Sequence, residues 1–126
     1  MIDFQNGEYI WTKLRKVNES AAGDTLQALL LPDEQILGIY NGIRDYVVFT
    51  DKRFLSVNVQ GVSGKKHDIT SMPYKRVSVF SVETAGVLGI DSELEMYFSG
   101  LGKVRFEFSG SSDIVKIGQM ISRFVL

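Results

Sequence analysis

The sequence contains no cysteine, two prolines and one histidine. Without cysteine, the chain has no disulfide framework, no thiolate nucleophile and no sulfur-rich metal site. Its longest strongly apolar run, Ala28 to Leu31, is far shorter than the roughly 20 residues of a membrane-spanning helix. The first residues carry early acids and no cationic segment before an apolar run, so we expect no secretory signal and a cytoplasmic protein. The net charge of −1 argues against a nucleic-acid partner, because such binding needs clustered lysine and arginine.

What is present is typical of one globular domain of 126 residues, 44% of them hydrophobic. Residues 1–34 carry a weak helical pattern. Ile10, Leu14 and Val17 recur at spacings of four and three, and a second short helix is expected from Asp24 until Pro32 stops it. The pattern predicts a helical N-terminal extension that docks on the rest of the domain.

From residue 35 to residue 110 the apolar period changes to two, with turn residues at regular intervals. In 53–60 and 103–109, apolar and polar side chains alternate, as in strands with one buried and one wet face. The phase breaks within 76–84, which predicts a β-bulge or bend. These features predict seven antiparallel strands near 35–41, 44–50, 53–60, 65–72, 76–84, 91–99 and 103–109.

The last two predicted strands can be aligned by their apolar residues. A three-residue loop of residues 100–102 places Phe98 opposite Val104, whereas a loop of two or four residues would place it opposite a polar residue. The same register places Glu95 opposite Glu107, an unfavourable pair of like charges.

Residues 111–126 return to a helical period. The apolar stripe Ile114, Ile117, Ile121 and Phe124 predicts an amphipathic helix that closes an open end of a barrel. Gly118 lies beside this stripe and predicts close approach to the sheet.

Several short motifs resemble those of the bacterial pleckstrin-homology-like family. The resemblance covers about residue 35 to the end, and it rests on Ile43-Arg44-Asp45, Val48-Phe49-Thr50-Asp51-Lys52-Arg53, Gln60-Gly61, Gly64-Lys65-Lys66, Pro73-Tyr74, Phe80-Ser81-Val82-Glu83-Thr84-Ala85-Gly86 and Ser99-Gly100. It implies a mainly β fold, in which a seven-stranded antiparallel bent barrel or sandwich is capped by the C-terminal helix. It also implies no catalysis and a tendency to form ring-like homo-oligomers. Phosphoinositide binding is not expected, because the first hairpin loop, Asn41-Gly42, is short.

Candidate chemistry is sparse, and we expect neither a cofactor nor a metal site. His67 could form a triad with Ser63 and Asp68, but no nucleophile-elbow motif accompanies it. Glu95 and Glu107 could serve a paired-carboxylate enzyme or bind a divalent cation. The favoured alternative is a hydrated face that Lys103 and Arg105 neutralise, and a third is that a basic group of a neighbouring subunit meets this face.

Two sets of residues are candidates for contacts with partners. Exposed aromatic side chains favour interfaces, although these aromatics could instead pack beneath the N-terminal helices. The candidate interface comprises Trp11, Phe54, Glu95, Tyr97, Arg105 and Glu107. The candidate anion patch comprises Arg44, Arg53, Lys65 and Lys66, although cations at strand ends more often protect sheet edges.

The sequence therefore predicts a non-catalytic module that forms a homo-oligomer and scaffolds a protein partner. The alternative is an adaptor for anionic lipid or a membrane surface, suggested by fold analogy alone. A remote third is an enzyme that uses the acidic strand.

Overall fold

The computed structural model describes the chain except residues 5–6, 43–44, 61–65, 85–90 and 111–113. Strands form most of it, and two α-helices and two short 3-10 helices (Glu19–Ala21 and Tyr74–Arg76) complete it. The strands are β1 (Glu8–Val17), β2 (Ile36–Asn41), β3 (Asp45–Thr50), β4 (Arg53–Gln60), β5 (Lys66–Pro73), β6 (Val79–Glu83), β7 (Asp91–Phe98) and β8 (Gly102–Ser109), and the α-helices are α1 (Asp24–Leu29) and α2 (Ile114–Val125). The predicted mainly β fold with a C-terminal helix is confirmed.

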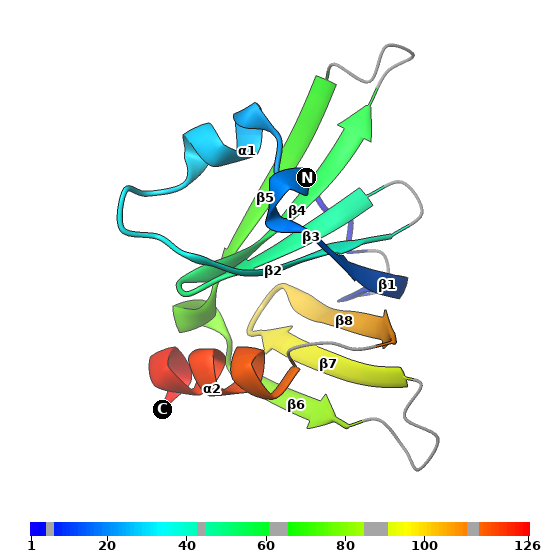
Figure 1. Cartoon of the computed structure of the whole chain (residues 1–126). Helices are drawn as coiled ribbons and strands as arrows, with labels where there is room; N and C mark the ends of the chain where they lie inside the picture. The colour runs from blue at the N-terminus through cyan, green and yellow to red at the C-terminus, as the bar shows by residue number, and fades with distance from the viewer. Residues whose placement is uncertain (5–6, 43–44, 61–65, 85–90, 111–113) are drawn as a thin grey trace.

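Within the described residues the strands form one eight-stranded sheet in the order β5-β4-β3-β2-β1-β8-β7-β6. The sheet is not closed, because β5 and β6 are its two ends and do not pair with each other. β1 lies at its centre, antiparallel to β2 and parallel to β8 (Figure 1). The sheet is therefore mixed and has one strand more than the seven predicted.

The predicted helix around Ile10, Leu14 and Val17 is wrong, because these residues belong to β1. The register of β1 against β8 shifts between Trp11 and Leu14, and Lys13 within this irregularity has a φ of 53°. A bulge adds a residue to the strand, so Trp11 and Leu14, three positions apart, both point into the core. Because of the bulge, the buried residues of this strand are spaced as they would be in a helix. The second predicted helix is confirmed as α1.

The predicted phase break in 76–84 corresponds to a larger change of direction than a bulge. After β5, the 3-10 helix Tyr74–Arg76 carries the chain from one end of the sheet towards β6 at the other end. Buried Tyr74 fixes this turn, since its hydroxyl donates a hydrogen bond of 2.8 Å to the carbonyl oxygen of Thr50.

Two apolar clusters stabilise the fold. Aromatic rings dominate the larger one, where Trp11 stacks on Phe106 at 4.6 Å between ring centroids. Ile117 and Ile121 of α2 are buried in this cluster, and a Cβ added to Gly118 would lie 3.3 Å from Val82. The predicted docking of the C-terminal helix and its close approach to the sheet are confirmed (Figure 1). The smaller cluster lies beneath α1, on the other face of β2 to β4.

The last hairpin is paired two residues away from the predicted register. Phe98 lies opposite Gly102 and Glu95 lies opposite Arg105, so the predicted opposition of Glu95 and Glu107 is wrong. The buried face is the same in both registers, because a shift of two residues preserves the alternation. Gly102 has a φ of +143°, and an added Cβ there would lie 2.6 Å from the carbonyl oxygen of Gly7.

A buried ion pair ties the α1–β2 connection to the β3–β4 turn. Arg53 donates two hydrogen bonds of 2.9 Å to the carboxylate of Glu34, one from Nε and one from Nη2. The Thr50 hydroxyl and the Leu31 N–H donate two more to the same carboxylate, at 2.6 and 3.1 Å. The Nη2 group of Arg53 also reaches the carbonyl oxygen of Leu29 at 3.0 Å. Arg53 thereby holds the end of α1 against β4.

Across the described part of the chain, every helix is too short or too polar to cross a membrane.

Candidate functional site

Four neighbouring strands, β6, β7, β8 and β1, expose one face of the sheet. Their inward residues belong to the core, so strand alternation turns the next ones outward. We call this surface the outer face: it comprises Val79, Ser81 and Glu83 of β6, Glu93, Glu95 and Tyr97 of β7, Lys103, Arg105 and Glu107 of β8, and Glu8 and Ile10 of β1. Five carboxylates and two cations give it a formal charge of −3. Four of the six residues of the predicted interface lie on this surface.

One end of the outer face is apolar. Val79 lies opposite Tyr97, and the two side chains are 64% and 45% exposed. Val79 is on the terminal strand and Tyr97 is on the strand beside it, because β6 is the last strand in the order and pairs with β7 alone among the described strands. A terminal strand presents unpaired backbone N–H and C=O groups to solvent and is a ready template for association.

The middle of the outer face is an ion-pair network. Glu95 lies 3.7 Å from Lys103 and 3.8 Å from Arg105, measured between charged atoms. Lys103 also approaches Glu8 at 3.6 Å, and Arg105 approaches Glu107 at 3.5 Å. All these side chains are about one-third exposed, so each pair contributes little stability, about 0–1 kcal/mol. The predicted neutralisation of Glu95 by Lys103 and Arg105 is confirmed.

The other end of the outer face is acidic. Glu93 lies between Glu83 of β6 and Glu107 of β8, in one row across the three strands. Burial raises the pKa of Glu93 above its ordinary value, and the charge of Glu83 raises it further, while Arg105 acts in the opposite direction. We expected Glu107 to lie opposite Glu95, but in the structure Glu107 lies opposite Glu93, and this is where the like charges meet.

Two aromatic residues of the predicted interface are not on any surface. Phe54 is fully buried and Trp11 is 4% exposed, and their rings meet edge to face at 5.7 Å. The prediction that they are exposed is wrong, because β1 is part of the sheet and carries Trp11 into the core. Tyr97 is exposed, as predicted.

The described cations do not assemble the predicted anion patch. Arg53 and Lys66 lie at opposite ends of the β4–β5 hairpin, about 20 Å apart at roughly 3.3 Å per residue. The guanidinium of Arg53 is bound by Glu34. Arg44 and Lys65 lie outside the described residues.

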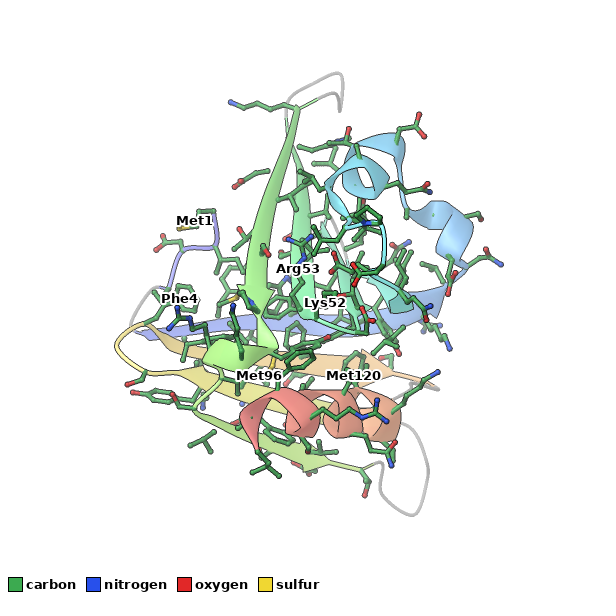
Figure 2. All side chains as sticks on the ribbon, turned by 90° about the vertical axis from the view of Figure 1, so that its left-hand side faces the viewer. Met1, Phe4, Lys52, Arg53, Met96 and Met120 are labelled. Atoms are coloured by element: carbon green, nitrogen blue, oxygen red, sulfur yellow. The ribbon has the colours of Figure 1, made fainter. Side chains whose placement is uncertain are left out.

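A second surface, which the sequence did not reveal, lies between the two α-helices. This groove has a volume of about 360 Å³ and lies on the side of the molecule seen in Figure 2, where Lys52 and Arg53 are labelled above α2. It is lined by Leu29, Leu31, Lys52, Arg53, Ser71, Pro73, Lys75 and Phe124. Leu29, Leu31 and Phe124 are each about half-exposed, whereas the core residues are buried. Phe124 was predicted to be buried with the rest of the α2 stripe, but it is 41% exposed, and its ring lies at the edge of the core, 6.1 Å from the ring of buried Tyr74 between centroids.

The charges that line the groove are all positive. Lys52 pairs with exposed Asp33 at 3.5 Å, and Arg53 pairs with buried Glu34. Lys75 has no ion-pair partner among the described residues and is exposed. The groove therefore combines apolar side chains with one cation that is available to an external anion.

The described residues offer little for metal or acid–base chemistry. In this part of the chain, no group of three or more histidine, aspartate or glutamate residues could hold a metal ion. His67 is exposed at the start of β5, and Asp68 accepts a hydrogen bond from the amino group of Met1. Ser63, the third member of the hypothetical triad, lies outside the described residues.

Comparisons with known proteins agree with this architecture. A family model described as a bacterial PH domain matches residues 7–125. The chain is 39% identical over 108 residues to the uncharacterised protein YjqA of Bacillus subtilis (strain 168), covering 84% of this chain and 86% of that one. It is 27% identical over 107 residues to the uncharacterised protein YozO of the same organism, covering 85% and 92%.

Two solved structures extend the comparison. The first is a DUF1696 family protein with a pleckstrin-homology domain from Shewanella loihica, with 36% identity, a TM-score of 0.70, and coverage of 91% of this chain and 99% of that one. The second is a pleckstrin homology domain from Shewanella amazonensis, with 38% identity, a TM-score of 0.56, and coverage of 81% and 83%.

Proposed function

The chain belongs to the bacterial PH domain family, and from this premise we propose that it is a non-catalytic interaction module that assembles with copies of itself through the outer face. The observation that carries the proposal is the apolar margin of that face. Val79 and Tyr97 are exposed side by side on a strand pair that ends the sheet. Association would cover both the apolar side chains and the unpaired backbone of β6.

A non-catalytic role is supported by the kind of fold and by the character of the polar groups. The PH fold is generally a binding module, and three carboxylates of the outer face, those of Glu8, Glu95 and Glu107, are engaged in ion pairs on an open surface. Enzymes place such groups in concave sites where burial and neighbouring charges tune them. An assembled module of this kind could scaffold a protein partner on the surfaces that assembly leaves free.

Anionic-lipid binding has weaker support. Of the cations predicted to form an anion patch, Arg53 is bound by Glu34 and Lys66 lies at the far end of the hairpin. We therefore favour self-assembly.

Light scattering coupled to size exclusion tests the proposal at micromolar concentrations. We expect the native chain to elute with a mass several times 14.1 kDa. Val79→Lys should reduce this mass, because it places a charge on the apolar margin. The matched control is Val115→Lys on α2, since Val115 is 63% exposed and Val79 is 64% exposed. A native chain that stays monomeric at every concentration, or a Val79→Lys variant that assembles normally, would refute the proposal.

A further inference from the structure

The groove between α1 and α2 brings exposed apolar side chains together from two helices. Leu29 and Leu31 are 51% and 52% exposed, whereas Leu30 between them packs against the smaller apolar cluster. Phe124 of α2 lines the same groove and is 41% exposed. Single exposed apolar residues are ordinary, but a contiguous group of them marks a surface that binds a partner.

The buried ion pair of the fold holds both exposed leucines in place. The N–H of Leu31 donates a hydrogen bond of 3.1 Å to the carboxylate of Glu34, and the carbonyl oxygen of Leu29 accepts one of 3.0 Å from Arg53. Since Glu34 and Arg53 also bind each other at 2.9 Å, the main chain at both leucines is tied to β4. A surface that is ordered before its partner arrives loses less conformational freedom on binding.

The same network reaches the apolar side chain from the other helix. The Thr50 hydroxyl donates a hydrogen bond of 2.6 Å to Glu34, and the Tyr74 hydroxyl donates one of 2.8 Å to the carbonyl oxygen of Thr50. The ring of Phe124 lies 6.1 Å from the ring of Tyr74 between centroids. The apolar lining of the groove therefore rests on one buried, hydrogen-bonded frame.

Two of the three cations that line the groove can receive an external carboxylate. Arg53 is bound by buried Glu34, so it belongs to the frame. Lys52 pairs with Asp33 at 3.5 Å, but the Asp33 side chain is 76% exposed, and such a pair is weak enough to be exchanged for another carboxylate. Lys75 is exposed and has no ion-pair partner among the described residues. No acidic residue is among those that line the groove.

We propose that this groove binds an acidic peptide segment of a partner protein. One or two bulky apolar side chains of the peptide occupy the groove, and neighbouring carboxylates meet Lys52 and Lys75. Large apolar side chains that fill a pocket are the usual anchors of protein interfaces. The groove shares no residue with the outer face, so this binding goes beyond self-assembly and does not depend on it.

A peptide fits the groove better than a membrane surface does. Lipid-binding patches of anionic membranes use about four to eight clustered lysine and arginine residues, whereas Lys52 and Lys75 are the two available here. The apolar side chains line a depression of about 360 Å³ (Figure 2). A depression receives an inserted side chain, whereas a membrane anchor has to project into the lipid.

Peptide display tests the chemistry of the partner. A library of random short peptides is selected on the full native chain. We expect the enriched peptides to combine a bulky apolar residue with neighbouring aspartate or glutamate, since the groove offers apolar side chains and only cations. Selection that enriches no sequence, or that enriches basic sequences, would overturn the proposal.

Fluorescence anisotropy with an enriched peptide then locates the site. Leu31→Ser removes an apolar contact but keeps the N–H hydrogen bond, and it should raise the dissociation constant about tenfold or more. Lys75→Glu should raise it by a similar factor at low salt and by less at high salt, because the attraction is screened. The matched controls are Leu101→Ser, since Leu101 is 51% exposed at a hairpin tip, and Lys116→Glu, which is exposed on α2 outside the groove. Both controls should bind like the native chain, and unchanged binding by Leu31→Ser would refute the site.

A charge swap tests the contact with Lys75. Each acidic residue of the enriched peptide is replaced by lysine in turn. One of these peptides should bind Lys75→Glu more tightly than it binds the native chain, because the reversed pair restores the attraction. If none does, no carboxylate of the peptide meets Lys75 and the proposed binding mode is wrong.

Light scattering of the same variants separates this binding from self-assembly. Leu31→Ser should have the same mass as the native chain, and a Leu31→Ser chain that loses assembly would show that a second copy covers the groove, which refutes a peptide partner. If the native chain is monomeric but selects acidic peptides, the proposed function fails and the groove assignment stands. Sedimentation with phosphatidylserine vesicles that Lys75→Glu abolishes, with no peptide enriched, would make the groove a membrane-binding surface and refute the proposal.

Discussion

Replacing Glu34 by glutamine should destabilise the fold by about 3 kcal/mol. The Glu34 side chain is fully buried and accepts four hydrogen bonds, two of them from Arg53. Glutamine has nearly the same shape, but it presents an NH₂ group where a carboxylate oxygen accepts hydrogen bonds. Removing one partner of a buried ion pair costs roughly 3–5 kcal/mol, because the other charge stays desolvated. We expect the lower end of this range, since the Arg53 side chain is 21% exposed and water can partly solvate it.

Urea and thermal unfolding, followed by circular dichroism at one protein concentration, measure this loss. For a chain of this length, about 3 kcal/mol lowers the melting temperature by about 10 °C. The control is Asp33→Asn, which removes an exposed pair with Lys52 and should cost less than about 1 kcal/mol.

The same prediction has a defined pH dependence. Burial alone would raise the pKa of Glu34, but the hydrogen bonds from Arg53, Thr50 and Leu31 and the Arg53 charge outweigh it, so the pKa in the folded state lies below its ordinary value. A lowered folded pKa gives stability that is complete above the unfolded pKa of about 4.3 and is lost as pH falls towards the folded value. The native chain should therefore exceed Glu34→Gln in stability by a constant amount above about pH 5 and by less at lower pH. A difference below 1 kcal/mol at pH 7, or one that grows as pH falls below 4, would refute the reasoning.

Three further predictions follow from single residues. Gly102→Ala should lower the free energy of unfolding in urea by about 2 kcal/mol or more. Its Cβ would lie 2.6 Å from the Gly7 carbonyl oxygen, and a backbone atom cannot move away as a flexible side chain could. A loss below 0.5 kcal/mol would contradict this close approach. Trp11, the single tryptophan, should emit blue-shifted fluorescence that acrylamide quenches poorly, since its ring stacks on Phe106 in the core; efficient quenching in the folded chain would place it on the surface instead. Glu93→Gln should leave the stability of a monomeric Val79→Lys background unchanged or slightly raised at pH 7, because it removes a charge that its neighbours disfavour; clear destabilisation would show that the acidic row is already neutralised within one copy.

The sequence did not reveal β1, and the reason is local geometry. Helix prediction relies on apolar residues three and four positions apart, and the bulge between Trp11 and Leu14 produces the same spacing in a strand. No hairpin turn next to this segment gave a further sign of a strand, because β1 is not joined to either partner by a tight turn. Its partners are β2 and, almost a hundred residues away, β8. Only the assembled sheet supplies those hydrogen bonds.

The candidate site was also predicted only in part, because some of its features follow from local patterns and others follow from tertiary structure. Alternation in β7 and β8 was sufficient to place Glu95, Tyr97, Arg105 and Glu107 on one face, because each strand turns successive side chains to opposite sides. Their pairing depended on a register that alternation defines only to within two residues, so the acidic row was assigned to the wrong glutamate. Val79 was not singled out at all, because its exposure follows from the position of β6 at the end of the sheet.

The sequence by itself determined seven of the eight strands, the buried faces of β7 and β8 and the docking of the C-terminal helix, because these depend on the period of apolar residues along short segments. Tertiary structure alone decided that β1 completes the sheet, that Arg53 is bound by Glu34, and that Leu31, Lys75 and Phe124 line one groove. Those features join segments distant in the chain. Which segments come together depends on the free energy of the whole folded chain, and a local sequence pattern does not contain that information.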